Sequence, residues 1–144
     1  MDGISYVFLG KELGGRPSES ESYCEGVADY ERMAEAPAFK KGLDRVIEGS
    51  KKYRIALLCS ERDPLDCHRC LLVGRALAER GIGVSHILDD GRVVSHAEIE
   101  DKLLEITGRN ANDLFAPRAE RLAAAYRERA RKVAFVEVAR TVAE

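Results

Sequence analysis

The feature that most constrains this chain is a short apolar run in its middle, Ile55 to Leu58, which polar residues follow directly. A continuous apolar run of this length is typical of a strand buried on both faces of a parallel sheet. A helix should follow, because apolar residues recur at helical spacing between Leu71 and Leu77 and Gly81 can end the helix. The sequence therefore predicts a strand-loop-helix unit at the centre of the chain.

The polar loop of this unit carries the candidate chemistry. In open α/β sheets, ligands bind beyond the carboxyl ends of the strands, where loops and helix N-termini converge. Five reactive or charged residues fall in the loop or at the start of the helix: Cys59, Glu61, Cys67, His68 and Arg69. A thiolate or a bound anion would meet unpaired N–H groups and the positive end of the helix dipole there. We therefore expect the site in this loop, with a Cys67 thiol more acidic than an ordinary cysteine.

These residue types favour an enzyme that acts on an anionic ligand, either nucleotide-like or phosphorylated. Glu61 would serve as the general acid or base, and Cys67 or Cys59 as a thiolate nucleophile or ligand. His68 and Arg69 would orient and bind the anionic group. The reaction and any cofactor are left open by the sequence.

A glycine pair near the N-terminus is the second part of the expected pocket. Gly14 and Gly15 must lie in a loop, since paired glycines permit positive φ and close approach of the backbone. Pro17 pushes Arg16 out of the helical region. We expect Gly14, Gly15 and Arg16 to bind the ligand together with the central loop.

The cysteines leave two alternatives to the enzyme open. Cys59, Cys67, His68 and Cys70 are zinc ligand types, so the loop could instead form a non-catalytic ligand- or zinc-binding module. Cys67 and Cys70 also form a C-x-x-C at a strand-loop-helix junction, the placement of dithiol redox sites. A third interpretation applies to Cys70 alone, because a cysteine beside Leu71 is most often a small buried hydrophobe.

The remaining elements complete an α/β fold. Further strands are predicted at residues 4–9 and 84–88, and helices at 27–52 with a break at Ala36-Pro37, from 95 or 96 to Gly108, and from Pro117 to about Thr141. We expect a three-layer sandwich with a small, mainly parallel sheet over residues 1–108. A linker and a C-terminal helical extension would occupy residues 109–144.

Composition excludes some functions. The 144 residues include 23 Lys and Arg against 25 Asp and Glu, and the resulting charge of -2 gives no strong nucleic-acid signal. No apolar run approaches the length of a membrane span and no signal pattern opens the chain, so we expect a cytoplasmic protein with no membrane association. Its cysteines should then be reduced.

The central motif resembles the family catalogued as domain of unknown function 488. Members have an apolar strand ending in Cys-x-Glu, here Cys59 to Glu61, then a loop such as Asp63-Pro64, and then Cys-His-Arg opening a helix, here Cys67 to Arg69. The resemblance extends over roughly residues 4–96 through three other segments: Leu13 to Arg16, Ala28 to Tyr30 with Met33 and Phe39, and His86-Ile87. It implies an α/β three-layer domain with its active site at the motif loop.

Two departures from the family set expectations for this chain. The family's Thr-Ile-Gly-His-Ser-like start and its later Asp-Val-Arg have no counterpart, so we expect the N-terminal strand-helix-strand unit to be missing. Relatives often have Ser or another residue at the position of Cys70. With only three predicted strands and an apolar stripe on the helix from Pro117, we expect a homo-oligomer that pairs through this helix or a sheet edge.

Overall fold

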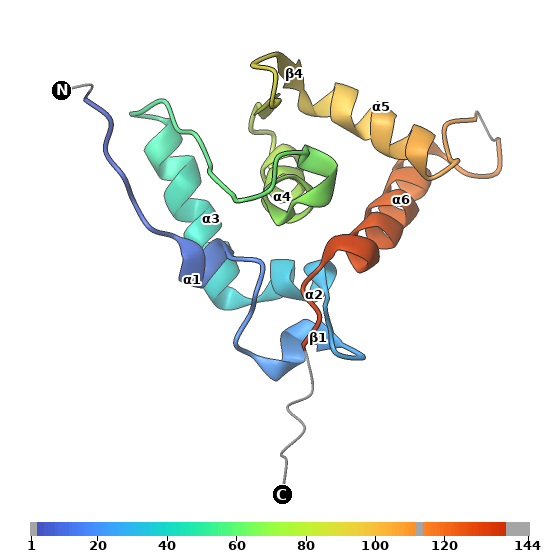
Figure 1. The fold of residues 1–144 in the computed structure, drawn as a ribbon, viewed down its shortest axis with the longest axis horizontal. Coiled ribbons are helices and arrows are strands. Elements are labelled where there is room, and N and C mark those ends of the chain that lie inside the picture. The colour runs from blue at the N-terminus through green and yellow to red at the C-terminus, as the bar shows by residue number, and fades with distance from the viewer. Residues whose placement is uncertain (1–2, 112–113, 138–144) are drawn as a thin grey trace, which may run out of the picture.

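The computed structural model describes residues 3–111 and 114–137 and is predominantly helical (Figure 1). Its helical segments are α1 (Gly10–Leu13), η1 (Ser20–Ser22), α2 (Tyr30–Glu35), α3 (Pro37–Ser50), η2 (Pro64–Asp66), the π-helix η3 (Arg69–Gly74), α4 (Arg75–Glu79), α5 (His96–Ile106) and α6 (Arg118–Val133). Its strands are β1 (Tyr23–Cys24), β2 (Val27–Ala28), β3 (Ser85–Ile87) and β4 (Val93–Ser95). No helix in these residues is long and apolar enough to cross a membrane.

The prediction of a three-layer α/β sandwich with a mainly parallel sheet is wrong. In the described residues the strands form two separate two-stranded antiparallel sheets, β1 with β2 and β3 with β4. Neither residues 4–9 nor residues 54–59 form a strand, and both segments are exposed: Ile4 is 88% and Leu58 90% accessible. An apolar run predicts an extended segment but not the strands that should lie beside it. No described strand lies beside either of these two segments to complete a ladder. Only the strand predicted at 84–88 forms, as β3.

The predicted helices agree better, because their ends are encoded locally. Ala36, with ψ of 135°, separates α2 from α3, and Pro37 opens α3. Ser95 caps α5 in a capping box with Glu98. Gly81 follows the end of α4 with φ of 78°, a left-handed conformation that glycine adopts without a Cβ penalty.

The core surrounds η3 and α4, which lie in the middle of the molecule between α3 on one side and α5 and α6 on the other (Figure 1). Cys70, Leu71, Leu72 and Val73 are all at most 3% exposed. A helix that is apolar on every side has to be surrounded in this way. The helix after the motif is therefore central, as the sequence predicts, although mainly helices and not a parallel sheet cover it.

The C-terminal helix packs on its own chain. Ala125, Tyr126 and Ala130 of α6 are buried, and the helix contacts α5, α2 and η2. It ends at Val133; the rest of the predicted helix, with Val138 in its apolar stripe, reaches beyond the described residues. The stripe thus has a partner within the chain.

Residues 134–137 return to the N-terminal hairpin. The backbone N–H of Ala28 donates to the carbonyl of Phe135 at 2.9 Å, and that of Glu137 donates to the carbonyl of Gly26 at 2.7 Å. Val27 and Val136 form an antiparallel bridge. The C-terminal end of the described chain is therefore joined to β2.

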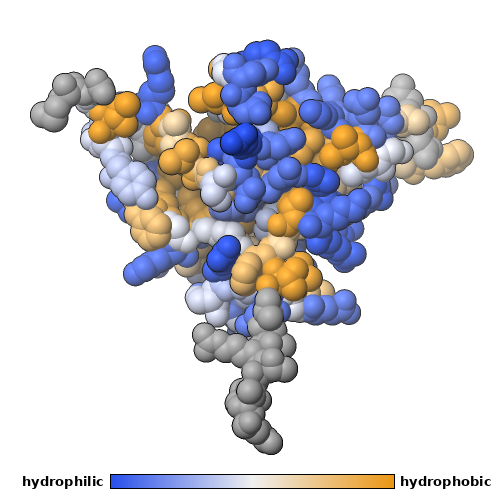
Figure 2. Space-filling view, in the orientation of Figure 1, coloured by the Kyte–Doolittle hydropathy of each residue, from blue (hydrophilic) through white to orange (hydrophobic). Residues whose placement is uncertain are grey.

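Apolar side chains remain exposed in the two extended segments. Figure 2 shows apolar surface beside the N-terminal end of the molecule. The exposed large apolar residues of these segments and of the turn before the second are Ile4, Tyr6, Val7, Phe8, Tyr53, Ile55 and Leu58. A surface of this kind is often an interface.

Candidate functional site

The motif residues are positioned by the short helix η2 and the start of η3. The Asp63 side chain accepts a hydrogen bond from the Leu65 N–H at 2.8 Å, which caps η2, and Pro64 occupies the first turn. Leu65 is 2% exposed and anchors the turn in the core. Cys67 follows at the junction and is 1% exposed. The loop is thus held between a buried turn and a buried helix.

Three side chains of the motif converge. Cys59, Cys67 and His68, here called the motif cluster, each place a ligand atom within 4.8 Å of the other two. The Cys59 Sγ lies 3.8 Å from the His68 Nδ1, and the backbone N–H of Arg69 donates to the Cys67 Sγ at 3.3 Å. Cys59 and His68 are half-buried. The cluster therefore combines two thiols and one imidazole at the edge of the core.

The expectation of an acidic Cys67 thiol is wrong in this geometry. Burial raises the pKa of Cys67, and the adjacent Cys59 raises it further; the N–H and the charge of Arg69 oppose this but are outweighed. Burial and the Arg69 charge lower the pKa of His68. At neutral pH the cluster therefore holds a protonated Cys67 thiol and a neutral imidazole.

The glycine pair reaches the motif cluster through Gly15. A Cβ added at Gly15 would lie 2.9 Å from the His68 Nδ1, so the backbone packs directly against the imidazole ring. Arg16 turns away, with its guanidinium carbon 4.8 Å from the centre of the Phe135 ring. The structure brings Gly15 to the motif, whereas the Arg16 side chain lies against the C-terminal segment.

The two charged residues of the motif flank the cluster. Glu61 is exposed, and its charge acts to raise the pKa of His68. Arg69 is half-buried, and its charge acts on Cys67, Cys70 and His68. Neither side chain forms an ion pair with another residue in the described part of the chain. Arg69 is thus a free cation beside two thiols.

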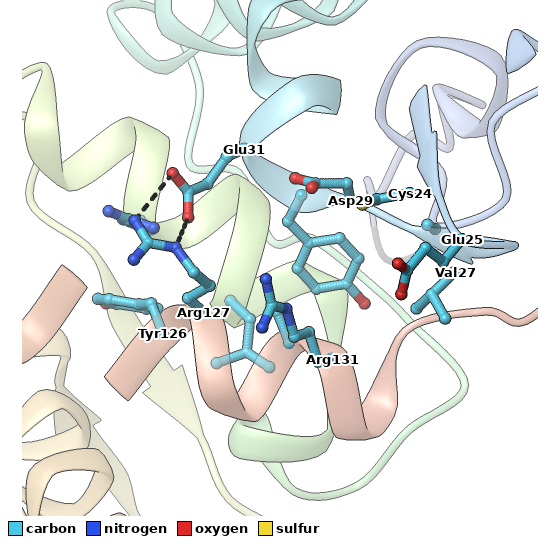
Figure 3. A pocket seen from close by; sticks show the side chains of 13 residues that line it. Cys24, Glu25, Val27, Asp29, Glu31, Tyr126, Arg127 and Arg131 are labelled. Carbon is cyan, nitrogen blue, oxygen red and sulfur yellow. Dashed lines mark hydrogen bonds and ion pairs between the residues drawn. The ribbon is translucent and has the colours of Figure 1, made fainter. Parts of the chain in front are cut away.

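A cavity of about 410 Å³ opens beside Tyr30. Figure 3 shows the side chains that line it. Tyr30 lines it, and burial raises the pKa of its phenol, with further contributions from Cys67, Cys59 and Glu61. Tyr30 therefore stands between the cavity and the motif cluster. Three arginines also line the cavity: Arg75, Arg127 and Arg131.

The cavity arginines were not predicted from the sequence. Arg127 pairs with Glu31 of α2 at 2.7 Å across the cavity (Figure 3). The alternating Arg and Glu of this helix indicate a solvated face, and only the packing of α6 against α2 shows that part of the face lines a cavity.

Cys70 does not join the motif cluster. It is fully buried and lies with His86 and His96 on the other side of the helix start. All four cysteines are free thiols. The sequence offered Cys70 as a partner for Cys67, and the structure places it in a different group.

The fold and this geometry define a mostly helical protein with a cysteine-histidine cluster at the start of its central helix. The profile of the family described as "Domain of unknown function DUF488" matches residues 1–76, more than half of the chain, and the chain belongs to this family. The match includes the whole motif from Cys59 to Arg69 and confirms the resemblance seen in the sequence. A search of curated proteins and a search of solved structures each returned no match.

Proposed function

We propose that the motif cluster binds Zn²⁺ through Cys59, Cys67 and His68. The observation that carries this proposal is the convergence of their three ligand atoms within 4.8 Å. Tetrahedral zinc with Zn–S near 2.3 Å and Zn–N near 2.0 Å separates a sulfur and a nitrogen by about 3.6 Å. The Cys59 Sγ and the His68 Nδ1 lie 3.8 Å apart, so a small adjustment would seat the ion.

The electrostatics of the cluster support a cation. Burial raises the pKa of the Cys67 thiol, so a thiolate there is costly unless a positive charge lies beside it. A bound dication supplies that charge and displaces the thiol proton. The Arg69 N–H that donates to Cys67 would stabilise the resulting thiolate. His68 is already neutral, as a ligand must be.

The surroundings support an enzyme rather than a closed structural site. Zinc with three protein ligands, two of them half-buried, keeps a fourth position that water or substrate can reach. The unpaired Arg69 would bind an anionic group of the ligand, and the exposed Glu61 would act as general acid or base. The proposed function is therefore zinc-dependent chemistry on a small anionic ligand.

Metal analysis of protein purified without chelator tests the zinc proposal. Cys59→Ser and His68→Ala should each lose one equivalent of zinc relative to the wild type. Cys24→Ser is the matched control, because this half-buried free cysteine lies outside the cluster. Unchanged zinc in both cluster variants would remove the proposal.

Binding of inorganic phosphate tests the anion proposal. Arg69→Ala should weaken phosphate binding by about tenfold, as expected for the loss of a charge-assisted hydrogen bond worth roughly 1.4 kcal/mol. Arg62→Ala, an exposed arginine of the same loop, is the control. Equal affinity in Arg69→Ala and the wild type would exclude Arg69 as the anion-binding group.

We also propose that the chain pairs with a second copy through the extended segments 3–9 and 54–58. The exposed apolar side chains of these segments support pairing there, whereas α6 already packs on its own chain. Light scattering at micromolar concentration should show a dimer. Phe8→Asp with Leu58→Asp should give a monomer, and Leu114→Asp, at a site 99% exposed outside the segments, should not. A monomeric wild type at every concentration would refute this.

A further inference from the structure

A second group of metal-ligand side chains lies inside the core. Cys70 of η3, His86 of β3 and His96 at the start of α5, here called the inner cluster, place their ligand atoms within 4.8 Å of one another. They are 0%, 4% and 7% exposed. Three separate elements therefore bring one thiol and two imidazoles together in a region from which water is largely excluded.

The hydrogen bonds around this cluster fix one tautomer of His96. The Tyr126 hydroxyl donates to the Glu100 Oε1 at 2.8 Å, so its oxygen is free to accept from the His96 Nε2, also at 2.8 Å. The same Nε2 lies 3.2 Å from the Glu100 Oε1. The proton of His96 therefore belongs on Nε2, and the lone pair of Nδ1 points to the His86 Nε2, 2.9 Å away.

This arrangement matches the surroundings of a metal-binding histidine. Such a histidine usually donates its second ring N–H to a carboxylate, which fixes the tautomer and raises the basicity of the ligating nitrogen. Glu100 and Tyr126 already do this for His96. The two ring nitrogens that face each other would need to separate from 2.9 Å to about 3.3 Å to accept an ion between them.

The protonation states of the cluster agree with this geometry. Burial, followed by the proximity of His96, lowers the pKa of His86 to about 4. Burial raises the pKa of Cys70 to about 12, with a further contribution from Cys67. The hydrogen bond from His96 lowers the pKa of Glu100, which keeps the carboxylate charged. The cluster thus offers a neutral His86 imidazole and a Cys70 thiol whose ionisation requires a cation.

The backbone of Gly74 lies directly beside the two histidines of the cluster. Gly74 ends the π-helix, and a Cβ there would stand 3.5 Å from the His86 Cε1 and 3.7 Å from the His96 Cε1. Single π-turns inside helices are frequent at functional sites because they re-aim side chains. The wider turn is associated here with a Cys70 that faces the two histidines and not the motif cluster.

We propose that the inner cluster is a second, structural zinc site, with Cys70 Sγ, His86 Nε2 and His96 Nδ1 as its ligands. Binding displaces the Cys70 proton to solvent and moves the His86 proton from Nε2 to Nδ1, so each Zn²⁺ releases one proton. A water molecule completes the tetrahedron. The ion would tie η3 to the β3–β4 hairpin and to α5, which follows the hairpin directly in the chain.

Zinc stoichiometry of the full chain tests this inference separately from the motif cluster. The wild type should bind two equivalents, Cys70→Ala one, and Cys67→Ser one. Cys70→Ala is chosen because it leaves a small apolar group in the core. If Cys70→Ala holds as much zinc as the wild type, the inner site is refuted. If Cys67→Ser holds as much zinc as the wild type while Cys70→Ala holds less, the motif site alone is refuted.

A spectroscopic test and a milder variant protect against misfolding. Replacement of zinc by Co²⁺ should give a thiolate-to-metal absorption band that Cys70→Ala reduces and Cys24→Ser leaves unchanged. Glu100→Gln removes only the charge that supports His96, so it should weaken the inner site by about tenfold in chelator competition. Equal affinity in Glu100→Gln and the wild type, in protein with an unchanged helical spectrum, would overturn the assignment of His96 as a ligand.

Discussion

The motif cluster and the inner cluster use the same residue types and meet one helix start through Cys67 and Cys70, yet their surroundings are opposite. The motif cluster has half-buried members and is flanked by the unpaired charges of Glu61 and Arg69. The inner cluster is buried, and Tyr126 and Glu100 hold the Nε2 of its His96. Ligand identity alone would not separate a reactive site from a structural one, whereas burial and the partners of each ligand do.

The difference shows clearly at the histidines. The ring of His96 has a hydrogen-bonding partner at each nitrogen. His68 contacts the Gly15 backbone and the Cys59 Sγ, and no carboxylate in the described residues hydrogen-bonds to it. The inner histidine is thus fixed in position, and the motif histidine is free to respond to a ligand.

The largest expected effect is on stability. His96→Ala should lower the free energy of unfolding by roughly 3 kcal/mol, because it removes a buried ring and leaves the His86 N–H without its acceptor. His68→Ala, the matched change at the motif cluster, should cost less than about 1 kcal/mol. Urea unfolding of both metal-stripped variants gives the comparison. Equal losses would show that the two clusters do not differ in structural role.

The next effect is a pH dependence that originates in the inner cluster. The pKa of His86 is about 4 in the folded state, below its ordinary 6.5, so the unfolded chain binds the extra proton first. The stabilisation is complete above pH 6.5 and decreases as the pH falls from 6.5 to 4, by roughly 2 kcal/mol. Around His86 lie His96, Arg69 and, through His96, Glu100.

Urea unfolding of the metal-stripped protein at pH 7 and at pH 5 measures this slope. His86→Asn should remove most of it, whereas His68→Asn, whose parent histidine has a pKa lowered by burial and Arg69, should remove less. A wild-type protein equally stable at both pH values would contradict the prediction.

A smaller effect concerns the position of His68. Gly15→Ala would place a Cβ 2.9 Å from the His68 Nδ1 and should displace the ring, which weakens zinc at the motif cluster by about tenfold. Gly83→Ala is the control, because a Cβ there meets nothing within 4 Å. Chelator competition on both variants gives the affinities. The zinc affinity of the inner site should be unchanged. A weaker inner site beside an unchanged motif cluster would contradict the assignment of Gly15 to the motif cluster.

The smallest effect is expected at Glu61. Glu61→Gln should change the free energy of unfolding by less than about 0.5 kcal/mol, because the side chain is exposed and forms no ion pair in the described residues. Any zinc-dependent turnover should be abolished. Thermal unfolding beside the activity assay separates the two effects, and a loss of several kcal/mol would make Glu61 a structural residue.

Signals in neighbouring residues predicted the helices, whereas the expected parallel sheet depended on contacts between distant segments. Ala36-Pro37 and Gly81 act on the backbone of their neighbours, so the breaks they predict are found. The apolar runs at 4–9 and 54–59 favour an extended chain, but a strand requires a partner from elsewhere in the sequence, which no local pattern supplies. The antiparallel pairing of β3 with β4 was missed although its turn at Asp90-Gly91 is a local hairpin signal.

The two clusters also differ in how far the sequence could predict them. The motif places Cys59, Cys67 and His68 within ten positions, so their convergence could be expected. His86 and His96 reach Cys70 only through the packing of a hairpin and a helix around η3, and the sequence shows just one cysteine and two histidines with no regular spacing. The π-turn that accompanies the separation of Cys70 from Cys67 has no recognisable sequence signal.

The return of residues 134–137 to β2 has a consequence for how this chain is made. The hydrogen bonds from Ala28 to Phe135 and from Glu137 to Gly26 join segments that lie more than 100 residues apart in the sequence, so the second is translated long after the first. Contacts between such distant segments form slowly, because the intervening chain must close first. During translation the hairpin of β1 and β2 therefore lacks this partner while the helices around η3 assemble. It can pair with residues 134–137 only after they have been synthesised.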